Sequence, residues 1–206
     1  EAGPNNLCPG VNDMTTEEIA AKWSSVGRPM FFNDVRIVDE NGVDVPEGES
    51  GELLFGGNLI FSGYWRDEEK TKSTLKDGWL YTGDIAYKDK DGYYYICGRK
   101  KNMFVSGGEN IYPIEIEHIL MNHPAVDHAC VFGVPDEKWG EIGKALVVLK
   151  SGWNVTKEEL QAYVKENSTS IKVPRYIQFL KELPKTPVGK VDMKTVLSKY
   201  SDCGDG

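Results

Sequence analysis

The feature that most constrains the fold is a change of pattern near residue 98. Before it, short apolar runs are separated by glycine-rich turns, among them Asn41-Gly42 and Asp91-Gly92, which are typical of hairpins. The stretch Gly98-Arg99-Lys100-Lys101 then contains no apolar residue. We therefore predict a domain boundary here, with a mostly antiparallel β-sheet domain over residues 1–98 and a second domain over residues 99–206.

Beyond residue 98, expected strands alternate with expected helices. The capping box Thr156-Lys157-Glu158-Glu159 opens one helix, and Pro113 suits the first position of another. The order β-α-β-β-α-β, followed by a last helix, predicts a small two-layer α/β domain. The chain is therefore expected to be of the α+β class, with an antiparallel β subdomain followed by this α/β domain.

Composition excludes several classes of protein. The 206 residues include 24 Lys and Arg against 32 Asp and Glu, a net charge of −8, which argues against a general nucleic-acid binder. No run approaches about 18 uninterrupted apolar residues, so no transmembrane helix is expected. The four cysteines lack metal-ligand spacing, and no signal-peptide pattern is present, which favours reduced thiols and a cytoplasmic location.

The first candidate for chemistry is Tyr81-Thr82-Gly83-Asp84, which we expect between two strands, Trp79-Leu80-Tyr81 and Ile85-Ala86-Tyr87. A carboxylate after a glycine can approach a ligand closely and accept hydrogen bonds from adjacent hydroxyls, as acidic residues do with ribose. The alternative is a turn in which Asp84 caps its own backbone, and these four residues alone favour the turn.

Two further stretches are candidates for anion binding. Paired Gly107-Gly108 permits close approach of the backbone to a bulky group, and Arg99 offers a planar fork for phosphate or ribose oxygens. The alternative is a β-turn before a helix. Farther on, prolines and Gly189 stiffen a loop that presents Lys190, whose ammonium can stabilise a developing anion. The alternative there is a solvated loop lysine.

The joint order and spacing of these motifs resembles the adenylate-forming superfamily, which includes acyl-CoA synthetases, luciferases and peptide-synthetase adenylation domains. The resemblance covers nearly the whole chain, and its stretches are Gly51-Glu52-Leu53, Gly63-Tyr64-Trp65, Thr71, Tyr81-Thr82-Gly83-Asp84, Gly98-Arg99 with Lys101, Ser106-Gly107-Gly108-Glu109-Asn110-Ile111-Tyr112-Pro113, Glu115-Ile116-Glu117, and Pro184-Lys185-Thr186 with Gly189-Lys190. The stretch that begins at Ser106 is most similar to fatty-acid and other acyl-CoA ligases.

The resemblance implies a carboxylic acid–CoA ligase. Such an enzyme joins ATP to a fatty or similar carboxylate, giving an acyl-adenylate and pyrophosphate, and then transfers the acyl group to CoA with release of AMP. Lys190 matches the catalytic lysine of the first step. Thr82, Asp84 and Arg99 are expected at the nucleotide, and Glu1 matches a Mg²⁺ ligand.

The resemblance also implies that the C-terminal domain rotates between the two half-reactions. Lys101 matches the hinge. Ser106, Gly107 and Gly108 are expected to line the channel for the pantetheine arm of CoA, where the missing glycine side chains leave room for the thiol. ATP, Mg²⁺ and CoA are the expected cofactors.

The sequence departs from the family pattern at its beginning. The family's Gly-rich Ser/Thr loop does not occur in these 206 residues, the chain opens without Met, and Glu1 lacks its preceding Thr. We therefore expect a C-terminal fragment that is inactive alone and whose partner is the missing N-terminal part of the same protein. Pyrophosphate exchange by the isolated chain would contradict this. Two alternatives stay open: an adenylation domain that loads a carrier protein, and a non-catalytic interaction module.

Overall fold

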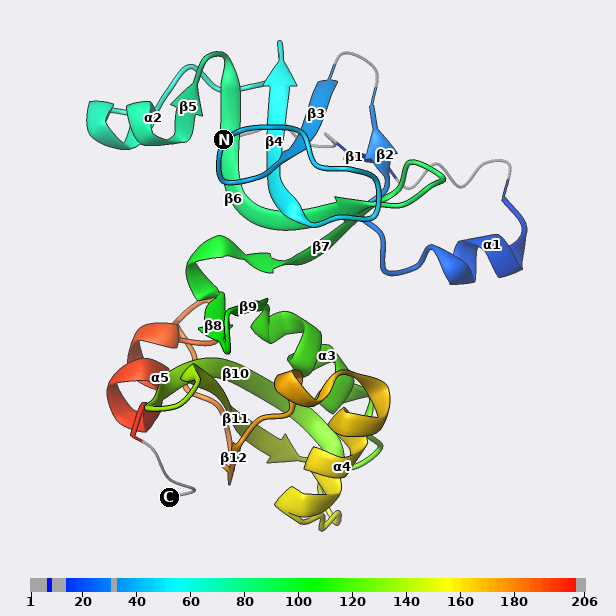
Figure 1. Ribbon diagram of the computed structural model, residues 1–206, viewed down its shortest axis with the longest axis vertical. Coiled ribbons are helices and arrows are strands. Elements are labelled where there is room, and N and C mark those ends of the chain that lie inside the picture. Colours follow the sequence, from blue (N-terminus) through cyan, green and yellow to red (C-terminus); the bar gives the residue numbers. More distant parts are fainter. Residues whose placement is uncertain (1–6, 9–13, 31–32, 203–206) are drawn as a thin grey trace. The chain divides into compact units, whose positions relative to one another are not determined.

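The computed structural model describes residues 7–8, 14–30 and 33–202 (Figure 1). The chain forms two compact units, Glu1–Lys101 and Asn102–Gly206. The division falls after Lys101, three residues beyond the boundary expected from the sequence. The last strand of the first unit continues through Arg99, which pairs with Asp84 on the neighbouring strand, and Lys100 then binds Glu52 of the same unit.

The first unit is built on a five-stranded antiparallel sheet with strand order β3-β4-β6-β5, in which β7 pairs with β6 (Figure 1). Strands β1 and β2 form a separate antiparallel pair. The buried apolar residues of this sheet include Ile37, Leu53 and Ala86. The elements of the unit are β1 (Leu7–Cys8), α1 (Thr16–Ala21), β2 (Arg28–Pro29), β3 (Asn33–Val38), β4 (Gly51–Gly57), α2 (Glu68–Thr74), β5 (Leu75–Lys76), β6 (Trp79–Lys88) and β7 (Tyr94–Arg99).

The turn at Asn41-Gly42 forms as predicted, but it does not connect two full strands. The segment after it makes only an isolated bridge between Val38 and Asp44. Beside the turn, the carboxylate of Asp39 accepts hydrogen bonds from the backbone N–H groups of Asn41 and Val43, both at 2.9 Å. Two backbone hydrogen bonds still join its sides, from the N–H of Asp39 to the carbonyl oxygen of Val43 at 2.8 Å and from the N–H of Val45 to that of Ile37 at 3.0 Å.

The second unit is a mixed sheet covered by helices on both faces (Figure 1). Its strand order is β10-β11-β8-β9, with β12 parallel to β11. The 3₁₀-helix η2 (Lys100–Asn102) leads into it. The further elements are β8 (Phe104–Ser106), β9 (Glu109–Ile111), α3 (Pro113–Asn122), β10 (Val126–Asp136), β11 (Gly140–Leu149), α4 (Lys157–Asn167), η3 (Ser170–Lys172), β12 (Tyr176–Phe179) and α5 (Met193–Tyr200).

Two buried clusters lie on opposite faces of this sheet. Along β11, Ala145 and Val147 face α3 and α4, whereas Leu146 and Val148 face α5. A strand that is buried on both faces carries a nearly continuous apolar run, which is the pattern here. The predicted α+β class is confirmed, and α5 adds a layer beyond the two that the sequence indicated.

Local signals fixed several element boundaries correctly. The capping box at Thr156 opens α4, and Pro113 begins α3. The structure shows a second capping box at Thr15, which opens α1. Asp192 caps α5 through the backbone N–H of Thr195. Among the residues that the structure describes, no helix has the length and apolar character needed to cross a membrane.

Candidate functional site

Strand β6 carries a bulge at Thr82-Gly83-Asp84. Tyr81 pairs with Leu54 and Ile85 pairs with Glu52, so three residues of β6 oppose a single residue of β4. Gly83 has φ +72°, a conformation that glycine adopts without a side-chain penalty. The expectation of two strands joined by a loop or turn was therefore wrong, because the bulge interrupts the pairing without ending the strand.

Side chains satisfy the backbone groups that the bulge removes from the ladder. The Thr82 hydroxyl donates to the carbonyl oxygen of Leu53 at 2.7 Å and accepts from the N–H of Asp84 at 3.0 Å. The N–H of Gly83 donates to Oε1 of Glu52 at 3.2 Å. Such bonds matter because an unpaired buried peptide group costs free energy.

Asp84 and Arg99 form an ion pair on adjacent strands. Nε of Arg99 lies 2.7 Å from Oδ1 of Asp84, and Nη1 of Arg99 donates to the carbonyl oxygen of Thr82 at 3.0 Å. The Asp84 side chain is 25% exposed, so its carboxylate remains accessible to a ligand. The structure thus brings Thr82, Asp84 and Arg99 together at one bulge.

Sequence reasoning gave no role to two residues of this cluster, Glu52 and Lys100. Nζ of Lys100 donates to Oε2 of Glu52 at 2.9 Å, and the Glu52 side chain is only 11% exposed. The signal was present, since Gly51-Glu52-Leu53 is one of the stretches that carry the family resemblance. Beside the bulge, a cavity of about 500 Å³ has Lys76, Lys100 and Lys101 on its wall.

Lys101 lies in η2 and is the last residue of the first unit. Its side chain is exposed. The chain passes between the two units only once, immediately after this residue.

The three residues expected in the CoA channel form the turn between β8 and β9. Ser106 is buried, whereas Gly107 and Gly108 have φ +57° and +86°. A Cβ at Gly107 would lie 2.8 Å from the ring of Trp139, but a Cβ at Gly108 would meet nothing within 4 Å. The two glycines therefore differ: the first is packed against an aromatic ring and the second faces open space.

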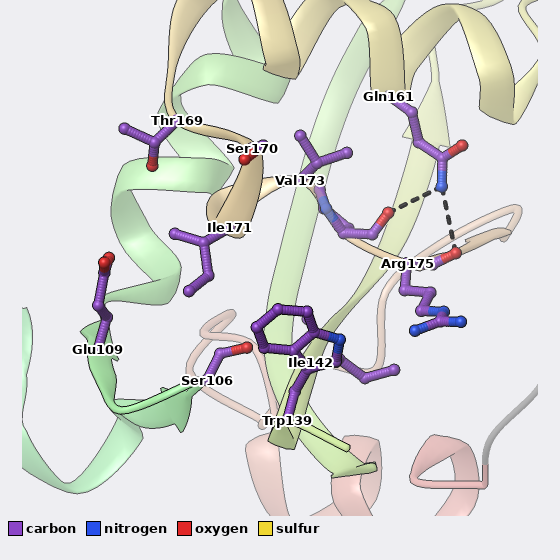
Figure 2. Close-up of a pocket in the computed structure, with 12 residues that line it drawn as sticks. Ser106, Glu109, Trp139, Ile142, Gln161, Thr169, Ser170, Ile171, Val173 and Arg175 are labelled. Atoms are coloured by element: carbon purple, nitrogen blue, oxygen red, sulfur yellow. Dashed lines mark hydrogen bonds between the residues drawn. The ribbon is translucent and has the colours of Figure 1, made fainter. Parts of the chain in front are cut away.

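A cavity of about 610 Å³ adjoins this turn (Figure 2). Figure 2 shows the ring of Trp139 between Ser106 and the segment with Ile171 and Val173. The opposite wall is held by Gln161, whose Nε2 donates to the carbonyl oxygens of Pro174 at 2.9 Å and Arg175 at 3.1 Å (Figure 2). The lining combines an aromatic face, aliphatic side chains and polar groups, which suits a ligand with both apolar and polar parts.

Lys190 lies on the loop between β12 and α5. Its carbonyl oxygen accepts from the N–H of Thr186 at 2.7 Å, and Lys185 bridges to Val191, so the loop is a tight hairpin. The Lys190 side chain is exposed and makes no ion pair or hydrogen bond with the residues that the structure describes. Its ammonium is therefore available to an anionic group.

The predicted Mg²⁺ ligand, Glu1, lies outside the described residues. Within the described ranges, no three His, Cys, Asp or Glu side chains gather into a metal site.

Comparisons with known proteins point to one family. Residues 2–65 match the family described as AMP-binding enzyme, and residues 115–190 match the AMP-binding enzyme C-terminal domain. The chain is 42% identical over 189 residues to a feruloyl-CoA synthase of Amycolatopsis, covering 92% of the chain and 38% of the relative. It is 44% identical over 188 residues to a medium/long-chain-fatty-acid–CoA ligase of Mycobacterium tuberculosis, covering 87% of the chain and 33% of the relative.

A solved structure with the same fold is the o-succinylbenzoate CoA synthetase of Bacillus subtilis in complex with its acyl-adenylate intermediate. The TM-score is 0.82 at 33% identity, and the match covers 94% of this chain and 38% of that one. The chain therefore spans less than two-fifths of the length of these relatives.

Proposed function

Because the chain belongs to the AMP-binding, adenylate-forming enzyme family, we propose that the protein carrying it is an acid–CoA ligase that works through an acyl-adenylate. ATP, a fatty or similar carboxylic acid and CoA are its substrates. The observation that carries the proposal is the bulge of β6, where Asp84 and Arg99 lie 2.7 Å apart next to a left-handed glycine.

The bulge supplies two kinds of recognition for a nucleotide. The partly exposed Asp84 carboxylate accepts hydrogen bonds from the ribose hydroxyls. Arg99, which is 54% exposed, keeps guanidinium N–H groups for ribose or phosphate oxygens beyond those bound to Asp84 and Thr82. Thr82 itself is engaged on both sides by backbone groups, so it supports the bulge rather than depending on a ligand.

Lys190 supplies positive charge for adenylation. As the carboxylate attacks the α-phosphate, negative charge builds on the phosphate oxygens, and a fixed cation lowers the free energy of that transition state. The hairpin around Thr186 limits the backbone freedom of the loop, and the ammonium has no competing carboxylate among the described residues. Mg²⁺ accompanies ATP in this proposal, but no step is assigned to it because the described residues gather no ligand set.

The turn at Gly107-Gly108 serves the second half-reaction. Gly108 faces open space, so the absence of its side chain leaves room for the narrow pantetheine arm. The adjoining cavity, with Trp139 and Ile171 on its wall, accommodates part of the rest of CoA. Rotation about Lys101 brings Lys190 to the reacting centre for adenylation and this turn to it for thioester formation.

The test measures the two half-reactions separately, in the protein encoded by the longest natural reading frame that contains this chain. Lys190→Ala should lower the rate of adenylate formation, measured as pyrophosphate release, by about 10²- to 10³-fold. The same variant should still transfer the acyl group from a supplied acyl-adenylate to CoA. Lys185→Ala, on the same exposed loop, is the matched control.

Gly108→Leu should do the reverse, blocking thioester formation while sparing adenylation. Its control is Gly152→Leu, because Gly152 also has a positive φ, +82°, and open space around its Cβ position. Loss of the same half-reaction in the Lys190 and Gly108 variants would refute the proposal. A carrier protein that outcompetes CoA as acceptor would replace it with a carrier-loading function.

A further inference from the structure

We propose that Glu52 is a positioning residue that holds the nucleotide-binding bulge and the segment before the pivot in one fixed arrangement. The inference rests on the proposed function, because it assigns Asp84 to the nucleotide. Glu52 itself touches no reacting group. It acts through Gly83, the residue next to Asp84, and through Lys100, the residue next to Lys101.

The two oxygens of the Glu52 carboxylate have different partners. Oε1 accepts from the N–H of Gly83 at 3.2 Å, and Oε2 accepts from Nζ of Lys100 at 2.9 Å. These partners are 31 and 48 residues away in the sequence. One side chain of β4 therefore joins the bulge of β6 to the segment that follows β7.

A carboxylate suits this place for a physical reason. The bulge leaves the Gly83 N–H without a strand partner, and the 11%-exposed side chain of Glu52 has little access to water. A carboxylate in such surroundings is stable only when donors or a cation satisfy it. The Gly83 N–H and the Lys100 ammonium meet that need, and Glu52 in turn satisfies them.

The consequence for the site is a fixed direction for Asp84. Gly83 sits at φ +72° and has no side chain to limit its backbone, so the bulge needs a restraint from outside. Glu52 restrains it on the Gly83 side, while Arg99 restrains it on the Asp84 side. Through its other oxygen, Glu52 holds Lys100, the residue before Lys101. The chain on this side of Lys101 therefore stays fixed during the rotation.

Four variants separate the two arms of the Glu52 carboxylate, which are its hydrogen bond with the Gly83 N–H and its hydrogen bond with Lys100. Glu52→Ala removes both. Glu52→Gln keeps an oxygen for the Gly83 N–H but removes the charge that binds Lys100. Lys100→Met removes only the Lys100 arm. Glu49→Gln is the control, because Glu49 is an exposed carboxylate in the loop before β4.

The first readout is the hydrogen-exchange rate of the Gly83 amide in the full chain, measured by NMR. Glu52→Ala should raise that rate about tenfold or more, since a charge-assisted hydrogen bond is lost. Glu52→Gln, Lys100→Met and Glu49→Gln should leave it within about threefold of the unaltered protein. An unchanged rate in Glu52→Ala overturns the proposal. If that variant does not fold, exchange at Gly83 is measured in Glu52→Asp instead. The shorter side chain of that variant cannot span both partners, so the exchange rate should rise, and an unchanged rate overturns the proposal.

The second readout is kinetic and separates positioning from a merely structural effect. In the longest natural reading frame that contains the chain, Glu52→Ala should raise KM for ATP about tenfold while kcat at saturating ATP stays within about threefold. An unchanged KM for ATP overturns the proposal even if the Gly83 rate rises. If the unaltered protein forms no adenylate, the proposed function fails, whereas the Gly83 exchange rates still decide whether Glu52 holds the bulge.

Discussion

At the scale of single residues, Asp89 shows how one carboxylate can organise a hairpin. Its Oδ1 accepts from the N–H groups of Asp91 and Tyr93, both at 2.9 Å, and its Oδ2 accepts from Nζ of Lys22 at 2.6 Å and the Tyr95 hydroxyl at 3.0 Å. Burial by itself raises the pKa of Asp89, but the bonds from Lys22, Tyr93, Tyr95 and Asp91 outweigh it and lower the pKa from 3.8 to about 2.

Asp89→Asn should therefore destabilise the chain at pH 7 by on the order of 1 to 2 kcal/mol. Because the pKa is lower in the folded state, the ionised carboxylate contributes stability above pH 3.8, and that contribution is lost as the pH falls towards 2. Urea denaturation between pH 7 and pH 2 should show that the variant lacks this acid-dependent loss. Asp34→Asn, at an exposed carboxylate in β3, is the control and should keep it.

The sequence could indicate candidate residues for the site but not their contacts. The family resemblance singled out Thr82, Asp84 and Arg99 because their spacing is local and is visible in the sequence. Glu52 received no role, since its two partners lie 31 and 48 residues away and only the folded sheet brings them to it.

At the scale of elements, Glu117 joins a helix to a strand across the core of the second unit. From α3, its Oε1 accepts from the N–H of Val131 in β10 at 2.8 Å. Burial raises the pKa of Glu117, and the hydrogen bond from Val131 offsets this only in part. The folded protein therefore favours the protonated carboxyl, and the contribution of Glu117 to stability falls as the pH rises from 4.5 through the raised pKa.

Glu117→Gln should remove that pH dependence, because the amide stays neutral and still offers an oxygen to Val131. Denaturation at a series of pH values between 4 and 8 tests this. The exposed Glu158→Gln on α4 is the control. A variant whose stability falls with rising pH as steeply as that of the unaltered chain would contradict the role given to Glu117.

Elements whose signals are local were predicted well, and those fixed by distant partners were not. The capping box at Thr156 and Pro113 act within one helical turn, so the sequence located α3 and α4. Strand β9 (Glu109–Ile111) was missed because its three residues have no alternating pattern and pair only with β8. The continuity of β6 was missed because Gly83 resembles a turn residue until the pairing on either side is known.

At the scale of the whole molecule, the change of pattern near residue 98 indicated two domains, and the chain has two compact units. Each unit contains its own buried apolar clusters, with Leu53 and Ala86 in the first and Leu120 and Leu146 in the second. A unit with its own core can unfold cooperatively by itself. We therefore expect calorimetry of the full chain to resolve two thermal transitions.

The two variants above assign these transitions. At pH 7, Asp89→Asn should lower the Tm of one transition, because Asp89 and its partners all belong to the first unit. Glu117→Gln should raise the Tm of the other, because it removes a buried charge from the second unit. If both variants move one single transition, the units do not unfold independently.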